Sequence, residues 1–327
     1  MPQETIFSFG ADEPKKKGKK SYADLLFSFL SQPGENDDTE FLSALRESSQ
    51  CTATSKMCLI SEGAYGRAYK LEDSDVSLVI KIPIENGFDK IEMQLNIQAF
   101  KACKQFKINP IAEALGFYRS SSLRLLHKDN FAFVYKYEDS LSTYAELIRQ
   151  TPLSVDDFKS LVFQQCLVLH TLQTKLPGFC HNDLHGYNIL IIRNAARHSF
   201  GSIKVDGSYC LKILDFGMAQ TRALCTRDAR KLYHETEYNP FVDFLSFCNH
   251  TLIYASAHAK KQGKYPPWLA DFLRFLQRHF HPQCIMNGKG TGAWLHYKYL
   301  FIDHPDGIKY INSKPKSLVS ILNDKYF

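Results

Sequence analysis

The chain has 327 residues, 44% hydrophobic and 23% charged, which is typical of globular proteins and suits one two-lobed domain or two small ones. Its formal net charge of +6 is compatible with an anionic ligand but too small to indicate nucleic-acid binding, so we expect no nucleic-acid partner. Nine single cysteines without a Cys-x-x-Cys pair argue against a disulfide framework or zinc site and favour a reducing intracellular compartment, and no apolar run is long enough to span a membrane.

Residues 1–50 are predicted to form a tail and two short helices. The tail contains the basic run Lys15–Lys20, which is typical of a solvated segment but also of a nuclear-import or polyanion-binding segment. Apolar residues at helical spacing follow in 22–30 and 41–45, on either side of a break at 33–38. These helices are expected to pack on the following domain or to regulate it.

Short strands are predicted from about residue 56. The stretch 60–70 is expected to form strand, turn and strand, and Gly63 and Gly66 would let its backbone approach a phosphate closely. Ser61 stands where a Gly-x-Gly-x-x-Gly loop has its first glycine, so a plain glycine-bearing hairpin is the alternative. We assign Gly63, Ala64, Tyr65 and Gly66 as candidate nucleotide-binding residues.

Lys81 lies inside the apolar strand 77–83. A buried lysine is costly unless it is paired, and a lysine here can reach nucleotide phosphates while a helical glutamate holds it. We predict a helix over about 88–104 and choose Glu92 as the partner. Glu85 is the second choice, because its closeness in sequence places it in the connecting loop.

A buried strand is predicted over 131–135, and the polar stretch 136–140 follows it. Backbone groups at this point are expected to bind adenine, which makes Tyr135, Lys136 and Tyr137 candidate nucleotide contacts. Two helices are then predicted, over 141–148 and 156–175.

The stretch Cys180–Ile191 contains His181, Asp183 and Asn188, and Asp215-Phe216-Gly217 follows 27 positions after Asn188. An Asp, an Asn five residues later and an Asp before Phe-Gly form an arrangement for phosphoryl transfer. The first Asp acts on the acceptor hydroxyl, while the Asn and the second Asp hold metal ions. The alternative is two ordinary loops that happen to carry acids.

The remaining elements are predicted as follows. Strands are expected at 189–192 and 210–214, joined by a long hairpin over 193–209. Residues 221–239 are basic and form either a solvated loop or an acceptor-binding or regulatory segment. Helices are expected over 241–257, around 268–276 after two prolines, and over 317–322.

Over residues 56–327 the chain resembles a divergent eukaryotic-type Ser/Thr protein kinase, with likeness to haspin-like kinases and to kinases of large DNA viruses. The resemblance rests on the glycine loop, the strand of Lys81, the hinge at 136–140, the two motifs above and the stretch Asp243–Ser246. In this family the Asp of that last stretch braces the catalytic loop.

The resemblance implies an α+β, bilobal fold with a β-rich lobe over 51–136 and a helical lobe over 137–327. It implies ATP and Mg²⁺ as cofactors and a protein substrate with a Ser or Thr hydroxyl. The sequence does not fix the oligomeric state, for which a monomer is the favoured expectation. Carried over, Lys81 anchors phosphates, Glu92 holds Lys81, Asp183 is the base, and Asn188 and Asp215 bind metal. His185 is a further candidate catalytic residue, because it stands where these kinases have a phosphate-contacting lysine.

Three departures from the family bear on regulation and substrate. Asn182 replaces the usual arginine, and His185 replaces the usual phosphate-contacting lysine. The third departure is that no Ala-Pro-Glu follows Asp215, with only about 28 positions between Asp215 and Asp243. We therefore expect activity without activation-segment phosphorylation. A small-molecule kinase of the choline or aminoglycoside type is the alternative function, and a pseudokinase scaffold is a third.

Overall fold

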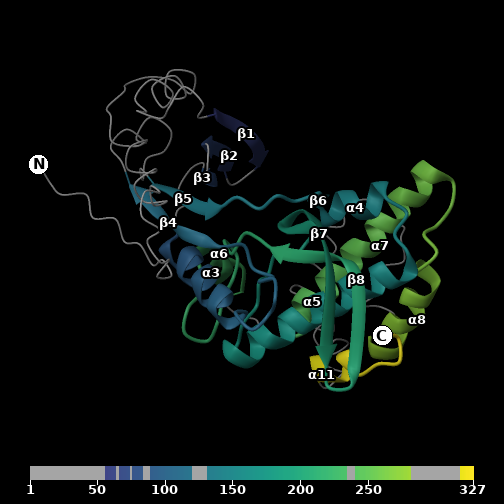
Figure 1. Ribbon diagram of the computed structural model, residues 1–327. Coiled ribbons are helices and arrows are strands. Elements are labelled where there is room, and N and C mark those ends of the chain that lie inside the picture. Colours follow the sequence, from purple (N-terminus) through teal and green to yellow (C-terminus); the bar gives the residue numbers. More distant parts are fainter. Residues whose placement is uncertain are drawn as a thin grey trace, which may run out of the picture. The chain divides into compact units, whose positions relative to one another are not determined.

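The computed structural model describes residues 56–63, 66–73, 76–83, 89–119, 131–233, 240–280 and 317–327. The predicted tail and helices of residues 1–50, the loop residues Ala64 and Tyr65, and Glu85 lie outside these ranges. The chain divides into two compact units, Met1–Ile97 with Ala112–Glu138 and Gln98–Ile111 with Asp139–Phe327. It is an α+β protein, with antiparallel sheets and several helices (Figure 1).

The first unit is built on a five-stranded antiparallel sheet in the order β1-β2-β3-β5-β4. Its strands are β1 (Lys56–Gly63), β2 (Gly66–Asp73), β3 (Val76–Pro83), β4 (Ala114–Arg119) and β5 (Phe131–Lys136). In β3, Leu78 and Ile80 are buried while Lys81 is partly exposed, because successive side chains of a strand point to opposite faces. Helix α3 (Lys90–Ala102) begins in this unit, where Met93 packs in a core cluster with Phe133.

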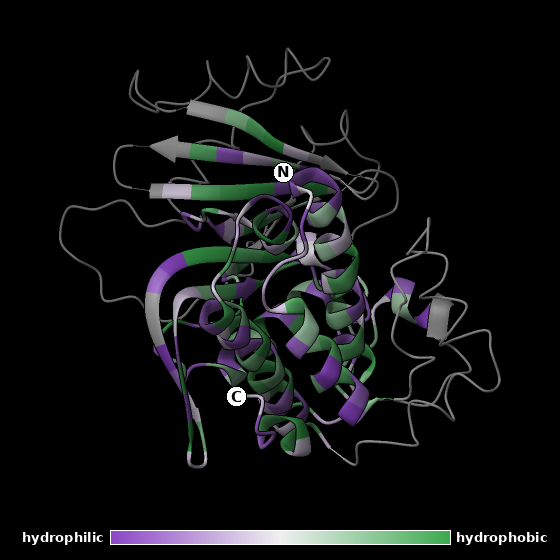
Figure 2. Cartoon of the chain, turned by 90° about the vertical axis from the view of Figure 1, so that its right-hand side faces the viewer, coloured by the Kyte–Doolittle hydropathy of each residue, from purple (hydrophilic) through white to green (hydrophobic). Residues whose placement is uncertain are grey.

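The second unit is mainly helical. Its helices are α4 (Tyr144–Gln150), α5 (Val155–Lys175), α6 (Arg227–Tyr233), α7 (Val242–Gln262), α8 (Leu269–His279) and α11 (Leu318–Leu322). Hydrophobic residues line the packed helices (Figure 2). Phe158 of α5 stacks on Trp268 with ring centroids 3.6 Å apart, and Phe272 of α8 meets Phe158 edge-on. The helices predicted over 156–175 and 241–257 are confirmed, and α7 runs on until Gly263 ends it with a φ of 71°.

A small sheet of β6 (Ser142–Thr143), β7 (Ile189–Phe200) and β8 (Ile203–Ile213) completes the second unit. The predicted hairpin over 193–209 is confirmed, because β7 and β8 stay paired along that stretch. Gly207 lies so close to α5 that an added Cβ would come within 2.3 Å of Ser160 Oγ. The hairpin therefore packs directly against α5.

The helix predicted over 141–148 begins later than expected. Residues 142–143 pair with β7 as strand β6, and α4 starts at Tyr144. The Thr143 hydroxyl accepts a hydrogen bond from the Glu146 N–H, and the Glu146 carboxylate accepts one from the Thr143 N–H. This capping box fixes the first turn of the helix. Thr143 followed three residues later by Glu146 is the sequence pattern that marks such a helix start.

Asp324 connects the C-terminal residues to α8. Its carboxylate accepts hydrogen bonds from Arg278 Nε at 3.1 Å, from His279 Nε2 at 2.8 Å and from the Tyr326 N–H at 2.7 Å. Burial acts to raise the pKa of this carboxyl, but the donors outweigh burial and lower the pKa to about 2. Burial lowers the pKa of His279 despite the facing carboxylate, so the charged donor at neutral pH is Arg278.

Asp324→Asn is expected to lower the free energy of unfolding by about 1–2 kcal/mol at neutral pH. Because the folded-state pKa is lowered from 3.8, this contribution is present above that pH and is lost as the pH falls towards 2. Denaturant unfolding should therefore show a difference in free energy between wild type and variant that is constant above about pH 4.5 and shrinks as the pH falls from about 4 towards 2. Asp271→Asn is the control, since its half-exposed pair with Arg274 should contribute less than about 0.5 kcal/mol. A difference that stays constant down to pH 3 would contradict the assignment.

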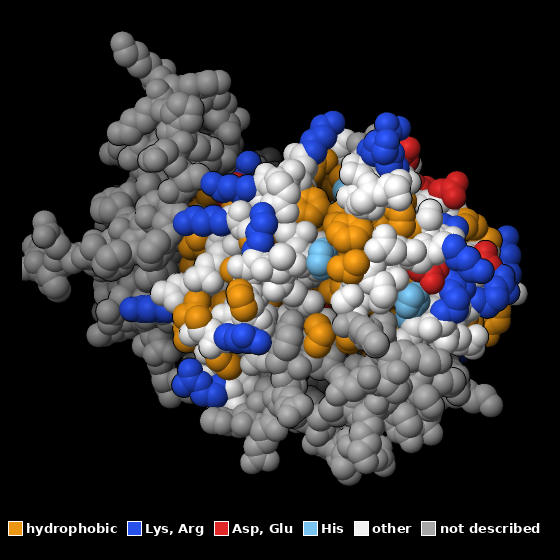
Figure 3. Space-filling view, turned by 90° about the horizontal axis from the view of Figure 1, so that it is seen from below, with side chains coloured by type: hydrophobic (Ala, Val, Ile, Leu, Met, Phe, Trp, Pro, Cys, Tyr) orange, Lys and Arg blue, Asp and Glu red, His pale blue; other side chains and the backbone are white. Residues whose placement is uncertain are grey.

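The surface of the described residues carries hydrophobic, polar and charged side chains (Figure 3). On the face drawn in Figure 3, hydrophobic side chains occur in groups between polar and charged ones. Among the helices of the described ranges, none has both the length and the apolar character needed to cross a bilayer.

Candidate active site

The backbone before Asp183 is held by a buried carboxylate. Asp243, at the start of α7, accepts hydrogen bonds from the His181 N–H at 2.6 Å and from the Asn182 N–H at 2.8 Å. Its side chain is buried, and burial raises its pKa, while His181 and the two N–H donors act in the opposite direction. Two backbone donors on one buried carboxylate fix the path of this loop.

Asn182 has a left-handed backbone, with a φ of 64°. Asparagine adopts this conformation more readily than most residues, which gives a local reason for its presence here. Its side-chain Nδ2 donates a hydrogen bond to the Met218 carbonyl oxygen at 3.0 Å. A neutral amide therefore links the loop before Asp183 to the segment after Gly217.

Asp183 and Asn188 are joined directly by two hydrogen bonds. Asn188 Nδ2 donates to the backbone oxygen of Asp183 at 2.9 Å and to its carboxylate Oδ2 at 3.1 Å. Because the amide nitrogen is used in this way, the amide oxygen of Asn188 is the atom that remains for a cation. The five-residue spacing thus brings a carboxylate and an amide oxygen to one place.

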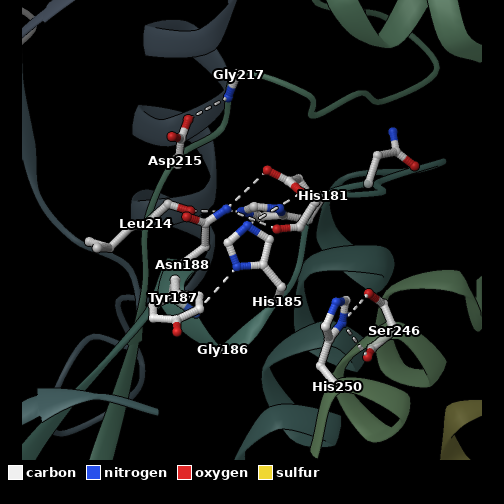
Figure 4. Close-up of polar contacts among 12 residues, drawn as sticks. His181, His185, Gly186, Tyr187, Asn188, Leu214, Asp215, Gly217, Ser246 and His250 are labelled. Carbon is white, nitrogen blue, oxygen red and sulfur yellow. Dashed lines mark hydrogen bonds and ion pairs between the residues drawn. The ribbon is translucent and has the colours of Figure 1, made fainter. Parts of the chain in front are cut away.

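His185 lies beside Asp183, with Nε2 at 3.6 Å from Asp183 Oδ1. The Tyr187 N–H donates to His185 Nδ1 at 3.2 Å, where the short helix η2 (Gly186–Asn188) begins. Nδ1 therefore carries no proton, and the neutral ring has its N–H at Nε2, facing the carboxylate. Figure 4 shows the ring of His185 between Asn188 and the α7 residue His250.

Asp215 follows the end of β8 and also has a left-handed backbone, with a φ of 55°. Its Oδ1 accepts a hydrogen bond from the Gly217 N–H at 3.2 Å. The residue before it is held twice: the Leu214 N–H donates to the Asn188 carbonyl at 2.9 Å, and His181 Nε2 donates to the Leu214 carbonyl at 2.8 Å. Both motifs of the sequence therefore meet in one hydrogen-bond network.

The donor set of this network suits a hard cation. Asn188 and Asp215 offer amide and carboxylate oxygens, the ligands that Mg²⁺ prefers when phosphates and water complete its shell. Within the described ranges no group of three or more His, Cys, Asp or Glu side chains could hold a metal by itself. A magnesium ion here would depend on phosphate ligands.

In the first unit, the predicted pairing of Lys81 with Glu92 is confirmed. Lys81 Nζ lies 3.1 Å from Glu92 Oε1, and the Glu92 side chain is only 4% exposed. Tyr135 also donates its hydroxyl to Glu92 Oε1, at 3.4 Å. Tyr135 lies opposite Val79 in the sheet and so shares a face with Lys81, which gives it a contact that the sequence did not predict.

The other predicted nucleotide contacts are placed as follows. Gly63 and Gly66 lie opposite each other at the ends of β1 and β2. The Lys136 N–H donates to the Glu113 carbonyl at 2.9 Å, and the Tyr137 N–H donates to the Ser77 carbonyl at 3.1 Å. Adenine recognition by these two N–H groups would require those bonds to open.

Two site residues on α7 were missed. Tyr254 accepts a hydrogen bond from the Gly186 N–H at 3.2 Å, and burial raises the pKa of its hydroxyl to about 12. An added Cβ at Gly186 would come within 2.6 Å of the Tyr254 ring, so only glycine fits there. His250 packs against His185 with ring centroids 5.9 Å apart, and burial lowers its pKa to about 4. His250 and Tyr254 follow Asp243 by seven and eleven residues, and this helical spacing places all three on one side of α7. It was the feature of the sequence from which they could have been found.

No protein-family profile matches the chain, and a search of curated proteins found no significant match.

Proposed function

We propose that the protein is an ATP-dependent phosphotransferase, and that its acceptor is a Ser or Thr hydroxyl of a protein. The observation that carries the proposal is the single network of Asp183, Asn188 and the backbone leading to Asp215. It holds a carboxylate and two oxygen ligands at fixed positions, as phosphoryl transfer requires.

In this proposal Asp183 accepts, or orients, the proton of the attacking hydroxyl. Asn188 Nδ2 holds one carboxylate oxygen, and the N–H of His185 faces the other. Because burial keeps His250 neutral at neutral pH, it adds no positive charge behind His185. These contacts hold the Asp183 carboxylate in one orientation, in which it could accept the proton of the hydroxyl.

Asn188 and Asp215 would hold Mg²⁺, which neutralises phosphate charge when it is bound. Lys81, held by Glu92 and indirectly by Tyr135, would bind phosphate oxygens through its ammonium group.

The deciding experiment is incubation with labelled ATP and Mg²⁺, in parallel with generic protein acceptors and with small alcohols such as choline. Label on protein Ser or Thr supports the proposal, and label on a small molecule alone replaces it with the second candidate. That candidate, a small-molecule kinase, is favoured by His181-Asn182-Asp183 and by the short stretch from Asp215 to Asp243. ATP binding with no transfer to any acceptor would favour a pseudokinase scaffold.

We predict that activity does not depend on phosphorylation of the segment after Asp215. Asn182 cannot form a charged fork with a phosphate, and its amide already binds the Met218 carbonyl. Treatment with phosphatase should therefore change the rate by less than about threefold. Thr226→Ala is not a suitable test, because its hydroxyl accepts the Ala229 N–H at the start of α6. Thr221 is unsuitable for the same reason, because its hydroxyl accepts the N–H groups of Ala223 and Leu224. Tyr233→Phe tests it instead, together with substitutions at Thr236 and Tyr238, which lie outside the described residues.

A loss of activity beyond about tenfold after phosphatase treatment, reversed by rephosphorylation, would show that a phosphate switch exists.

A further inference from the structure

The segment after Gly217 is rich in positive charge. Residues 221–233 contain four basic residues and one acid, Asp228, a formal charge of +3. Three arginines of this segment have exposed side chains, and we call them the arginine surface: Arg222, Arg227 and Arg230.

Two of these arginines, Arg222 and Arg230, have no ion pair with an acid within the described ranges. Arg227 Nε lies 4.0 Å from Asp228 Oδ1, a contact between partly exposed groups that contributes little to stability. Arg230 donates to the Cys225 carbonyl at 3.4 Å. Neither Arg222 nor Arg230 forms an ion pair with any residue of the described ranges. An anionic ligand could therefore bind Arg222 and Arg230 without displacing a carboxylate of the described residues.

The segment has a fixed place beside the loop that carries Asp183. The Arg222 N–H donates to the Pro177 carbonyl at 2.9 Å, and Cys180 and Gln220 exchange two backbone hydrogen bonds of 3.0 and 2.8 Å. These contacts lie in the second unit and end three residues before Asp183. A ligand held by the segment is thus held at a defined position relative to the candidate base.

The start of α6 is anchored as well. Thr226 is fully buried; its N–H donates to the Ala219 carbonyl at 3.2 Å, and its hydroxyl accepts the Ala229 N–H. Arg227 and Arg230 are three residues apart on this helix and so project from neighbouring positions on its surface.

We propose that the arginine surface selects acceptor polypeptides with Asp, Glu or phosphorylated residues near the accepting hydroxyl. The proposal rests on the function proposed above and names its substrate class. Guanidinium groups bind carboxylate and phosphate oxygens through paired N–H donors, and they repel acceptors with flanking Lys or Arg.

The test compares three peptides that share one Ser and differ only in its flanks: Asp/Glu, phosphoserine or Lys/Arg. The wild-type protein should show a kcat/KM for the acidic peptides at least about tenfold above that for the basic one, mainly through KM. The variant R222Q/R227Q/R230Q should lose most of this preference. The control K260Q/K261Q/K264Q removes the same charge from exposed lysines at the end of α7 and should keep it. The two acidic peptides show whether carboxylate or phosphate is preferred.

A binding measurement separates this inference from the proposed function. Fluorescence anisotropy measures how tightly fluorescently labelled peptides bind the full chain carrying Asp183→Asn. This measurement does not depend on phosphoryl transfer. If acidic peptides bind through the arginines but the wild type transfers no phosphoryl group, the arginine surface is supported and the kinase proposal is wrong. Equal binding of acidic and basic peptides would overturn the inference, as would equally tight binding of a DNA oligonucleotide of the same charge. Loss of transfer to a neutral peptide in the triple variant would also overturn it, because the arginines would then bind an internal phosphate.

Discussion

Asp183→Asn is expected to lower the rate of phosphoryl transfer by roughly 10²–10⁴-fold while leaving the fold intact. The amide cannot accept the proton of the acceptor hydroxyl. Its oxygen can still accept the hydrogen bond that Asn188 Nδ2 donates to Asp183 Oδ2 in the wild type. The loop, which is held through its backbone by Asp243, should therefore keep its position.

Initial rates with labelled ATP measure the effect, and denaturant unfolding with ATP titration shows whether folding and binding persist. Asp206→Asn is a matched control, because this carboxylate lies on the β7–β8 hairpin, is 65% exposed and pairs with Arg197. Turnover above about a tenth of the wild-type value would exclude Asp183 as the base.

Lys81→Ala is expected to reduce the transfer rate by roughly 10²-fold, and Glu92→Ala by about tenfold. Lys81 is the group that would meet phosphate, whereas Glu92 acts only by positioning it, with Nζ and Oε1 3.1 Å apart. In Lys81→Ala the buried Glu92 keeps the Tyr135 hydroxyl as a donor, which limits the loss of stability.

A double-mutant cycle tests whether the two residues act as a unit. If Glu92 works only through Lys81, then the double variant should be no slower than Lys81→Ala alone. Lys101→Ala removes an exposed lysine from the last turn of α3 and should have no effect. Rate losses that multiply in the double variant would mean that Glu92 has a separate role.

Local features of the sequence were sufficient for several parts of this protein. The placement of Lys81 among strand residues, with Glu92 in the first turn of a helix, predicted their pairing, because a lysine in an apolar strand needs a counter-charge. The long helices α5 and α7 followed from apolar periodicity. The start of α4 was predicted too early, since pairing of β6 with β7 competes with helix formation and local periodicity does not report it.

Only the tertiary structure decided how the candidate site is held. Asp243 binds the backbone N–H groups of His181 and Asn182 across about 60 positions, and Tyr254 binds that of Gly186 across 68. A kinase-like role for Asp243 could be inferred by resemblance, but the contact itself depends on how α7 packs in the second unit. Asn182 is a second example. The sequence shows that its side chain is a neutral amide, but only the structure shows that this amide donates a hydrogen bond to the Met218 carbonyl oxygen. Side-chain type and spacing along the chain are local properties, whereas a hydrogen bond between distant residues exists only once packing has brought donor and acceptor together.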